Sequence, residues 1–167
     1  MQKVNVTLAV AMAAGLAACA TQGAMTVVDA GATGASLPKY RNAVVVRSVS
    51  GGQAFNVLTV PGVTDEPFKA ALESSLESKG YLARSGAPKF TIDAEIQNLD
   101  QPVIGLNYDV TATVTYKVSG AGPSATYPIS AIGSASFSDS PLGVDRIRIA
   151  NERAMQQNIR MFLQQLR

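Results

Sequence analysis

The chain has 167 residues, with 14 Lys and Arg against 12 Asp and Glu, one Cys, no His and no Trp. Its 47% hydrophobic and 16% charged residues exclude a chain that is disordered throughout and indicate about one folded domain. The net charge of +2 argues against nucleic acid as a partner, and the lack of His beside a single Cys excludes most hydrolytic triads and zinc sites.

The first nineteen residues have the pattern of an export signal. One basic residue, Lys3, precedes a short apolar stretch, and the small and aliphatic residues Leu16, Ala17 and Ala18 suit a signal peptidase. The stretch is too short for a transmembrane helix, which needs about 20 apolar residues. Together with Cys19, the three residues resemble a bacterial lipobox; the alternative is an ordinary signal peptide with a chance Cys nearby.

The lipobox resemblance implies that Cys19 is the first residue of a mature lipoprotein and carries three acyl chains. Two or more chains hold a protein stably on a membrane, whereas one chain gives only marginal binding. In the lipoprotein pattern an Asp after the Cys retains the protein in the inner membrane, and here Ala20 occupies that place. The resemblance therefore implies an outer-membrane anchor and a periplasm-facing protein, on the assumption of a Gram-negative cell.

We expect three parts in the chain: a signal peptide at 1–18, a lipidated flexible tether at 19–42 and a single α+β periplasmic domain at 43–167. The tether from Ala20 to Asn42 is rich in Ala, Gly, Thr and Ser and has little periodicity. As a random coil of about 22 residues it would reach roughly 25 Å r.m.s..

The domain begins with a predicted strand at Ala43–Val49, a β-branched run that Ser50, Gly51 and Gly52 close. Asn56–Val60 is a weaker strand or a loop. A helix is then predicted from Thr64, where a capping residue precedes two acids and a Pro, to Gly80. Its apolar stripe consists of Phe68, Leu72 and Leu76.

Three alternating segments follow, at Phe90–Gln97, Tyr108–Val118 and Tyr127–Phe137. Such period-two runs are typical of an antiparallel sheet with one buried and one polar face. A last amphipathic helix is predicted from Ser140-Pro141 to the C-terminus. The order β-α-β-β-β-α predicts an α+β fold, in which two amphipathic helices cover one face of an antiparallel sheet of about four strands.

With these elements in place, the chain resembles the YajG-like family of small bacterial lipoproteins. The lipobox, the helix Phe68–Gly80 with Tyr81, and the strands Phe90–Leu99 and Asn107–Val118 carry this resemblance, which covers most of the mature chain. The outline is also similar to LptE, the lipoprotein of the lipopolysaccharide translocon, and to auxiliary lipoproteins of ABC-type lipid transporters. The resemblance implies a location and a fold, and the family has no catalytic residues to transfer.

The best catalytic candidates are Asp93, Glu95 and Asp109, on the polar faces of neighbouring predicted strands. Asp93 and Glu95 share a face, and paired carboxylates can hold a cation or do acid–base work. The alternative is a solvated polar face on which Lys117 and threonines balance the charge. Nothing else converges there, so we expect no enzyme activity, no metal site and no cofactor.

Arginines recur every seven residues along the last helix, at Arg146, Arg153, Arg160 and Arg167. Because a heptad drifts by only about 20°, these side chains are predicted to form one basic ridge opposite the apolar face. From Pro141 to Arg167, five Arg stand against Asp145 and Glu152, a net charge of +3. Such a ridge can bind anionic lipid headgroups or lipopolysaccharide phosphates, or it can simply be a solvated helix face.

A second candidate surface is the polar sheet face, formed by Thr111, Thr113, Thr115, Asp93, Glu95 and Gln97. This face can dock a partner or face water. The leading hypothesis is a membrane-anchored envelope lipoprotein that acts as a non-enzymatic accessory or binding module in lipid or lipopolysaccharide transport or assembly. The alternative is a structural or protein-interaction subunit of an envelope complex with no lipid ligand.

Overall fold

The computed structural model describes residues 24–28, 37–53, 62–102 and 105–166. Its elements are the short 3-10 helix η1 (Pro38–Tyr40), the strands β1 (Val44–Ser50), β2 (Phe90–Asp100), β3 (Tyr108–Gly120) and β4 (Gly122–Ala135), and the helices α2 (Asp65–Ser78) and α3 (Gly143–Gln165). The predicted order β-α-β-β-β-α and the α+β class are confirmed. The weak strand predicted at 56–60 lies outside the described residues.

The four strands form one sheet in the order β1-β2-β3-β4. The pairs β2–β3 and β3–β4 are antiparallel as predicted, whereas β1 and β2 are parallel. The parallel pair arises because α2 carries the chain back along the sheet, so that β2 starts at the same end as β1. The expectation of a purely antiparallel sheet is therefore wrong for this pair.

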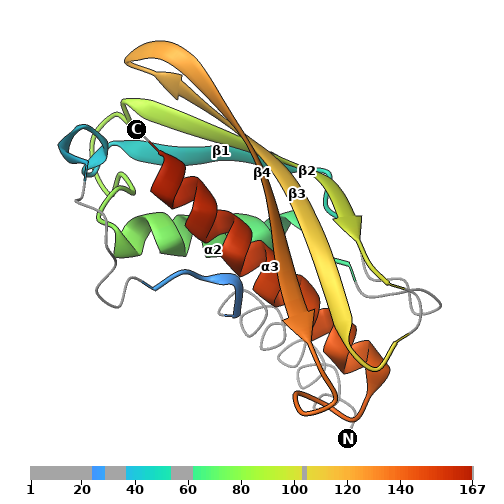
Figure 1. Cartoon of the computed structure of the whole chain (residues 1–167). Helices are drawn as coiled ribbons and strands as arrows, with labels where there is room; N and C mark the ends of the chain where they lie inside the picture. Colours follow the sequence, from blue (N-terminus) through green and yellow to red (C-terminus); the bar gives the residue numbers. More distant parts are fainter. Residues whose placement is uncertain (1–23, 29–36, 54–61, 103–104, 167) are drawn as a thin grey trace, which may run out of the picture.

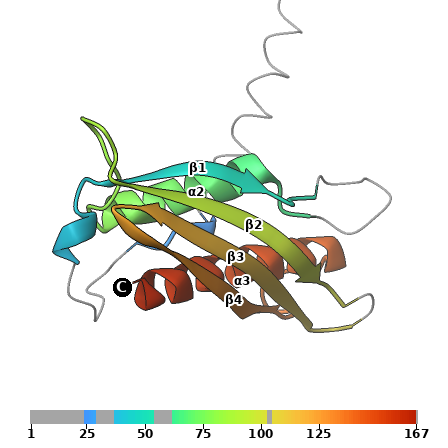
Figure 2. The same ribbon diagram turned by 90° about the horizontal axis from the view of Figure 1, so that it is seen from above.

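Both helices lie on the same side of the sheet, as predicted (Figures 1 and 2). Alternate residues of the strands and one stripe of each helix meet in a single hydrophobic core. At its centre, the ring of Tyr116 stacks on Phe162, with ring centroids 4.0 Å apart and ring planes 7° from parallel. Burying side chains of this size contributes roughly 1.5–3 kcal/mol each, which makes the core the main source of stability.

The core also contains a polar contact between α3 and the sheet. The Asn158 side-chain amide donates hydrogen bonds to the carbonyl oxygens of Ala112 in β3 and Ile129 in β4, each at 3.0 Å. Its side-chain oxygen accepts a 2.8 Å hydrogen bond from the Tyr116 hydroxyl. Complete burial raises the pKa of Tyr116 well above its usual value, so the hydroxyl remains a donor.

Helix α2 ends as its sequence predicts. Gly80 takes the left-handed conformation, with φ of 70°, directly after the last turn. The amides of Gly80 and Tyr81 then bond back to the carbonyls of Glu77 and Leu76, at 2.8 and 2.9 Å. The Thr64 side chain, by contrast, makes no capping hydrogen bond at the start of the helix.

The described parts of the predicted tether are packed, which corrects the expectation of a flexible chain from 19 to 42. Met25 is fully buried, Val27 is nearly so, and both belong to the hydrophobic core. Tyr40 in η1 is also buried, with its ring edge-on to Phe90 at 4.8 Å. These isolated apolar residues are too few to produce a periodic pattern in the sequence, yet each fills a gap that the helices and the sheet leave.

Candidate functional site

The face of the sheet opposite the helices is open: no described segment covers it (Figure 2). The structure places the predicted polar residues on this face, and it brings them together across strands. Glu95 lies opposite Thr115, and Thr113 lies opposite Ser130 with their hydroxyl oxygens 3.3 Å apart. Ile132 on β4, which is 62% exposed, adds one apolar side chain beside Thr111.

Two β-bulges decide which side chains reach the open face. The register shifts between Val46 and Ser48 in β1 and between Ile96 and Asn98 in β2. Each bulge holds two consecutive polar residues, 47–48 and 97–98, outside the core, and the next apolar residue returns to the core side. The sequence prediction placed Gln97 on the polar face correctly but missed that Asn98 follows it there.

Asp93 is held by neighbours on β1 and β3. The Arg47 guanidinium forms a two-pronged ion pair with its carboxylate, and the Ser48 hydroxyl donates a hydrogen bond at 2.6 Å. Lys117 lies opposite Asp93 in the register. The Arg47 hydrogen bonds keep the pKa of Asp93 below its usual value, so this carboxylate stays ionised and already bonded, a poor state for a general acid or base.

Of the other two predicted carboxylates, Glu95 shares the open face with Asp93, two residues along β2, whereas Asp109 lies far from it. Asp109 lies opposite Ser134, eight residues along β3 from Lys117, and therefore roughly 26 Å from the level of Asp93. Glu95 is exposed on the open face. Within the described residues, no group of three or more His, Cys, Asp or Glu side chains is arranged to hold a metal ion.

The open face is slightly acidic. Its carboxylates belong to Asp93, Glu95, Asp100 and Asp109, against the two cations Arg47 and Lys117, which leaves an excess of two negative charges. Threonine and serine hydroxyls occupy most of the remaining area. Such a surface offers hydrogen bonds and a weak negative field to a partner.

The predicted basic ridge on α3 is wrong at its first position. Arg146 is only 6% exposed, and its guanidinium donates to the carbonyls of Ser140 and Pro141 at 3.0 and 3.1 Å. The rings of Tyr108 and Phe137 lie on it, with centroids 5.3 and 5.6 Å away. The connection between β4 and α3 folds back over the first helical turn, so this Arg holds a loop instead of facing water.

The other ridge positions also differ from one another. Arg153 donates to the Ser134 carbonyl and pairs with Asp139, whose pKa this contact lowers to about 2. Arg160 is exposed and bonds Gln157 within its own helix. Arg167 lies outside the described residues. The structure therefore leaves Arg160 as the one described member of the predicted ridge that faces solvent without an acidic partner.

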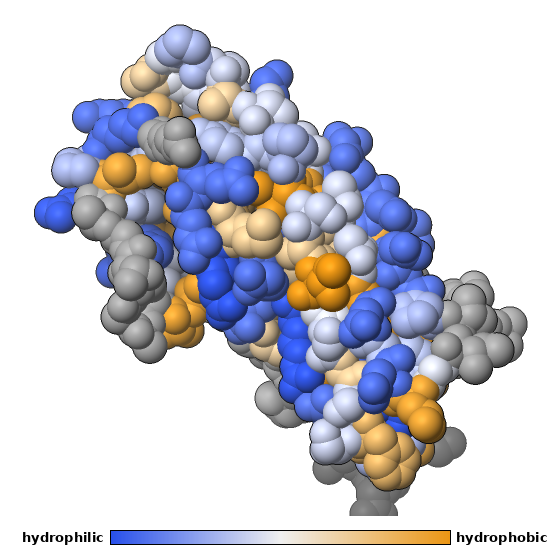
Figure 3. Space-filling view, in the orientation of Figure 1, coloured by the Kyte–Doolittle hydropathy of each residue, from blue (hydrophilic) through white to orange (hydrophobic). Residues whose placement is uncertain are grey.

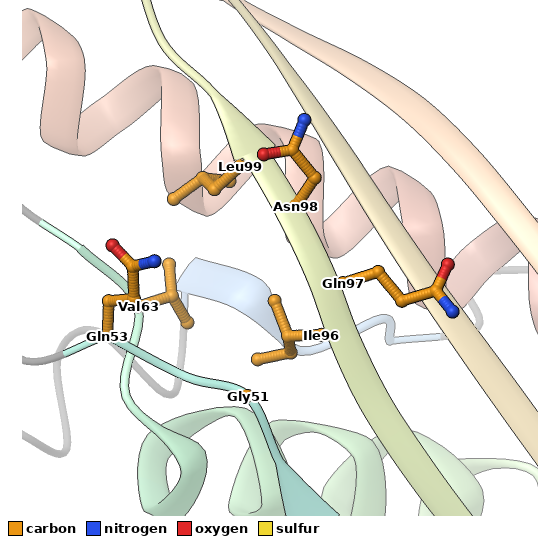
Figure 4. Close-up of a pocket in the computed structure, with 7 residues that line it drawn as sticks. All are labelled: Gly51, Gln53, Val63, Ile96, Gln97, Asn98 and Leu99. Atoms are coloured by element: carbon orange, nitrogen blue, oxygen red, sulfur yellow. The ribbon is translucent and has the colours of Figure 1, made fainter.

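A small cavity lies at the β2 bulge, between β2 and the chain that follows β1 (Figure 4). Its volume of about 20 Å³ holds at most a water molecule. Gly51, in the left-handed conformation with φ of 85°, forms one side of the cavity. Only glycine fits at this position, because a Cβ there would lie 2.1 Å from the Ile96 carbonyl oxygen. The cavity is a consequence of the bulge and far below the roughly 300 Å³ of a small-molecule site.

A larger cleft of about 140 Å³ lies beside the β3–β4 hairpin and η1. The aromatic residues Tyr40, Phe90 and Tyr127 line one side of it, together with Lys39. This volume is still below that of ligand pockets. At the opposite end of the molecule, the connection into α3 exposes an apolar patch (Figure 3), where Phe137, Leu142 and Val144 are about 60% exposed.

The predicted lipidation residue Cys19 and the signal-peptidase residues Leu16, Ala17 and Ala18 lie outside the described residues. No helix in the described ranges is both long and apolar enough to cross a bilayer. The sequence prediction also missed Met25 and Val27 of the docked N-terminal segment. The apolar-polar-apolar order of Met25, Thr26 and Val27 was the available sequence signal. An alternation of three residues is too short to be distinguished from chance.

No family model and no curated protein sequence matches the chain. Among solved structures, the chain is similar to a Xanthomonas campestris protein of the DUF330 family, with 12% identity over 62% of this chain and a TM-score of 0.45. That match spans 60% of the Xanthomonas protein, less than two thirds of its length.

Two further solved structures are similar to the chain. A "hypothetical protein" from Chlamydia trachomatis has 16% identity over 72% of this chain and 91% of its own, with a TM-score of 0.46. A "putative lipoprotein" from Caulobacter crescentus has 10% identity over 86% of this chain and 89% of its own, with a TM-score of 0.40. No function is taken from these likenesses, and the resemblance to the YajG-like family and to LptE stays a prediction.

Proposed function

We propose that the protein is a lipid-anchored envelope lipoprotein that acts as a non-enzymatic binding module for an envelope protein. The anchor rests on the lipobox 16–19, in which Cys19 receives the acyl chains, and on Ala20, which favours the outer membrane. The domain then faces the periplasm.

The observation that carries the binding role is the open, hydroxyl-rich sheet face. Strands of 7, 11, 13 and 14 residues, at about 3.3 Å per residue and 4.8 Å per strand, give the face an area of about 700 Å². This area is close to one side of a standard protein–protein interface, which buries about 800 Å² per partner. A two-layer domain that buries one sheet face and leaves the other polar and open has room for one such partner.

The chemistry of the face indicates the kind of partner. Its hydroxyls and its excess of two negative charges suit a protein surface that presents hydrogen-bond donors and a positive patch. An anionic lipid ligand has less support than the sequence suggested, because Arg146 is buried and Arg153 is paired with Asp139. We therefore favour a protein-interaction role over a direct role in lipid or lipopolysaccharide transport.

The non-enzymatic part of the proposal is supported by the state of Asp93. Its carboxylate accepts hydrogen bonds from Arg47 and Ser48, and its pKa is lowered. An acid–base catalyst needs a carboxyl group that exchanges protons near the working pH. Asp93 instead acts as a link between β1 and β2.

Site-specific photo-crosslinking in intact cells tests the binding role. A photoreactive residue replaces Thr113 at the centre of the open face, and the matched control replaces Gln164, an exposed residue of α3 on the other side of the domain. We expect one discrete protein adduct from position 113 and none from position 164. The charge reversal Glu95→Lys should remove that adduct, whereas an unchanged adduct, or the same adduct from position 164, would contradict the proposal.

The anchor is tested separately by membrane fractionation. Cys19→Ala should leave the precursor unprocessed or release the protein from the envelope. In a Gram-negative host, Ala20→Asp should shift the protein from the outer to the inner membrane. A Cys19→Ala chain that still fractionates with the outer membrane would overturn the anchor.

A further inference from the structure

The N-terminal segment at residues 24–28 is docked between the two helices (Figure 2). Met25 is fully buried, and the Val27 amide donates a 2.9 Å hydrogen bond to the Ser75 hydroxyl of α2. On the other side, the Gln156 side chain of α3 donates a 3.0 Å hydrogen bond to the Thr26 carbonyl. The segment is therefore fixed to both helices.

The Ser78 hydroxyl of α2 completes this attachment by donating a 3.0 Å hydrogen bond to the Val27 carbonyl. The contacts alternate along the segment: the side chains of 25 and 27 point into the core, and the polar backbone of 26 and 27 bonds the helices. This pairing of burial with backbone hydrogen bonds is how an added strand or strap is held in a fold.

Docking shortens the free chain between the proposed lipid and the domain. The sequence alone suggested about 22 residues between Cys19 and Asn42, but the chain is already buried at Met25, six residues after Cys19. Whatever its conformation, a chain of six residues spans at most about 22 Å. The helix layer around the docked segment must then lie within that distance of the bilayer surface.

From these distances we infer that the helix layer faces the membrane and that the open sheet face points away from it. This inference rests on the proposed lipid anchor at Cys19. To lay the open face on the bilayer instead, the six-residue link would have to pass the edge of the sheet, about 10 Å sideways at 4.8 Å per strand. It would then have to pass the helix-to-sheet spacing of about 10 Å and the side chains of the open face, which add about 5 Å. This path of about 25 Å exceeds the available 22 Å.

One side chain on the docked segment fits a lipid surface. Val28 directly follows the buried residues of the docked segment and is 74% exposed. An exposed aliphatic side chain next to an acyl anchor can enter the boundary between headgroups and acyl chains. The open sheet face, which carries the proposed protein-binding site, then faces the periplasm.

Fluorescence quenching on vesicles tests this orientation with the acylated mature chain. The lipidated Cys19 is the only Cys in the sequence, so single labels can be introduced by Gln164→Cys on the exposed side of α3 and Ser130→Cys on the open face. Each labelled protein is reconstituted into phosphatidylethanolamine–phosphatidylglycerol vesicles that contain a headgroup-labelled quencher lipid. We expect several-fold stronger quenching at position 164 than at position 130.

Met25→Asp is the matched control for docking, because a carboxylate cannot occupy the fully buried Met25 position and the segment should detach. It should keep the protein on the vesicles while reducing the difference between the two labels. Equal quenching at both positions in the wild-type background, or stronger quenching at 130, would overturn the orientation. A protein that does not sediment with vesicles and has no acyl group would overturn the anchor itself, a distinct result.

Discussion

Replacing Asn158 by Ala should be among the most damaging single changes in this fold. Asn158 is fully buried and joins α3 to two strands through three hydrogen bonds, to Tyr116, Ala112 and Ile129. The Ala side chain would leave the buried Tyr116 hydroxyl without its acceptor and both carbonyls without this donor. A stranded buried polar group costs about 1–3 kcal/mol, so a total loss of about 3–5 kcal/mol is expected.

A double-mutant cycle makes this prediction specific to the hydrogen-bond network. Tyr116→Phe alone should cost about 1–2 kcal/mol, because it removes one hydrogen bond and leaves the Asn158 oxygen unpaired. In the double variant the Tyr116 hydroxyl, which Asn158→Ala alone would leave without an acceptor, is already absent. The loss of stability in the double variant should therefore be about 1–2 kcal/mol smaller than the sum of the two single-variant losses.

Urea unfolding followed by circular dichroism measures these free energies of unfolding. Gln164→Ala, an exposed change on the same helix, serves as the control and should stay within about 0.5 kcal/mol of the wild type. A loss below about 1 kcal/mol for Asn158→Ala, or strict additivity in the cycle, would refute the reasoning that this amide is a stabilising link between helix and sheet.

Three further changes test the packing and the arginines. Gly133→Ala should lower the free energy of unfolding by at least about 1–3 kcal/mol in urea titrations, because the new Cβ would lie 2.1 Å from a backbone nitrogen of α3; a neutral change would contradict the close helix–strand contact. Asp139→Asn should lower the melting temperature at neutral pH. Since the pKa of Asp139 is about 2 in the folded protein against an ordinary 3.8, the difference from wild type should persist above about pH 5 and disappear as the pH falls towards 2; a pH-independent difference would argue against the Arg153 pair. Arg146→Lys should cost about 1–3 kcal/mol in thermal unfolding, whereas Arg160→Lys should be nearly neutral, and equal effects would restore the reading of a uniform solvated ridge.

The alternation of apolar and polar residues was sufficient to predict the strands and their buried faces. In β3, the alternation from Tyr108 to Val118 holds without interruption, and the burial pattern follows it. The bulges were not predicted, although Arg47-Ser48 and Gln97-Asn98 each place two polar residues side by side where strict alternation would require one. Consecutive polar residues inside an alternating run are thus a usable signal for a bulge.

Local sequence patterns could not predict the parallel pairing of β1 with β2 or the surroundings of the α3 arginines. Strand direction depends on how α2 crosses the sheet, which is a property of the whole chain. The heptad spacing of Arg146, Arg153 and Arg160 correctly puts them on one side of α3, but it contains no information on which loop packs against that side. Arg146 is buried because the 136–142 connection folds over it.

The docked N-terminal segment was missed for a related reason. Its composition of small and polar residues is typical of a linker, and its two core residues, Met25 and Val27, are isolated in the sequence. Only the tertiary structure shows the gap between α2 and α3 that they fill. With the proposed anchor at Cys19, this packing replaces a domain on a long tether by one that we propose is held close to the bilayer.

The central claim, a lipid anchor at Cys19, is tested most directly by the intact mass of the protein purified from membranes of cells grown with labelled palmitate. The account predicts that residues 1–18 are absent, that the chain begins at Cys19, and that this residue carries the label as a diacylglyceryl thioether and an amide-linked acyl chain. A chain that retains residues 1–18, or one that is cleaved elsewhere and carries no acyl group, would contradict it.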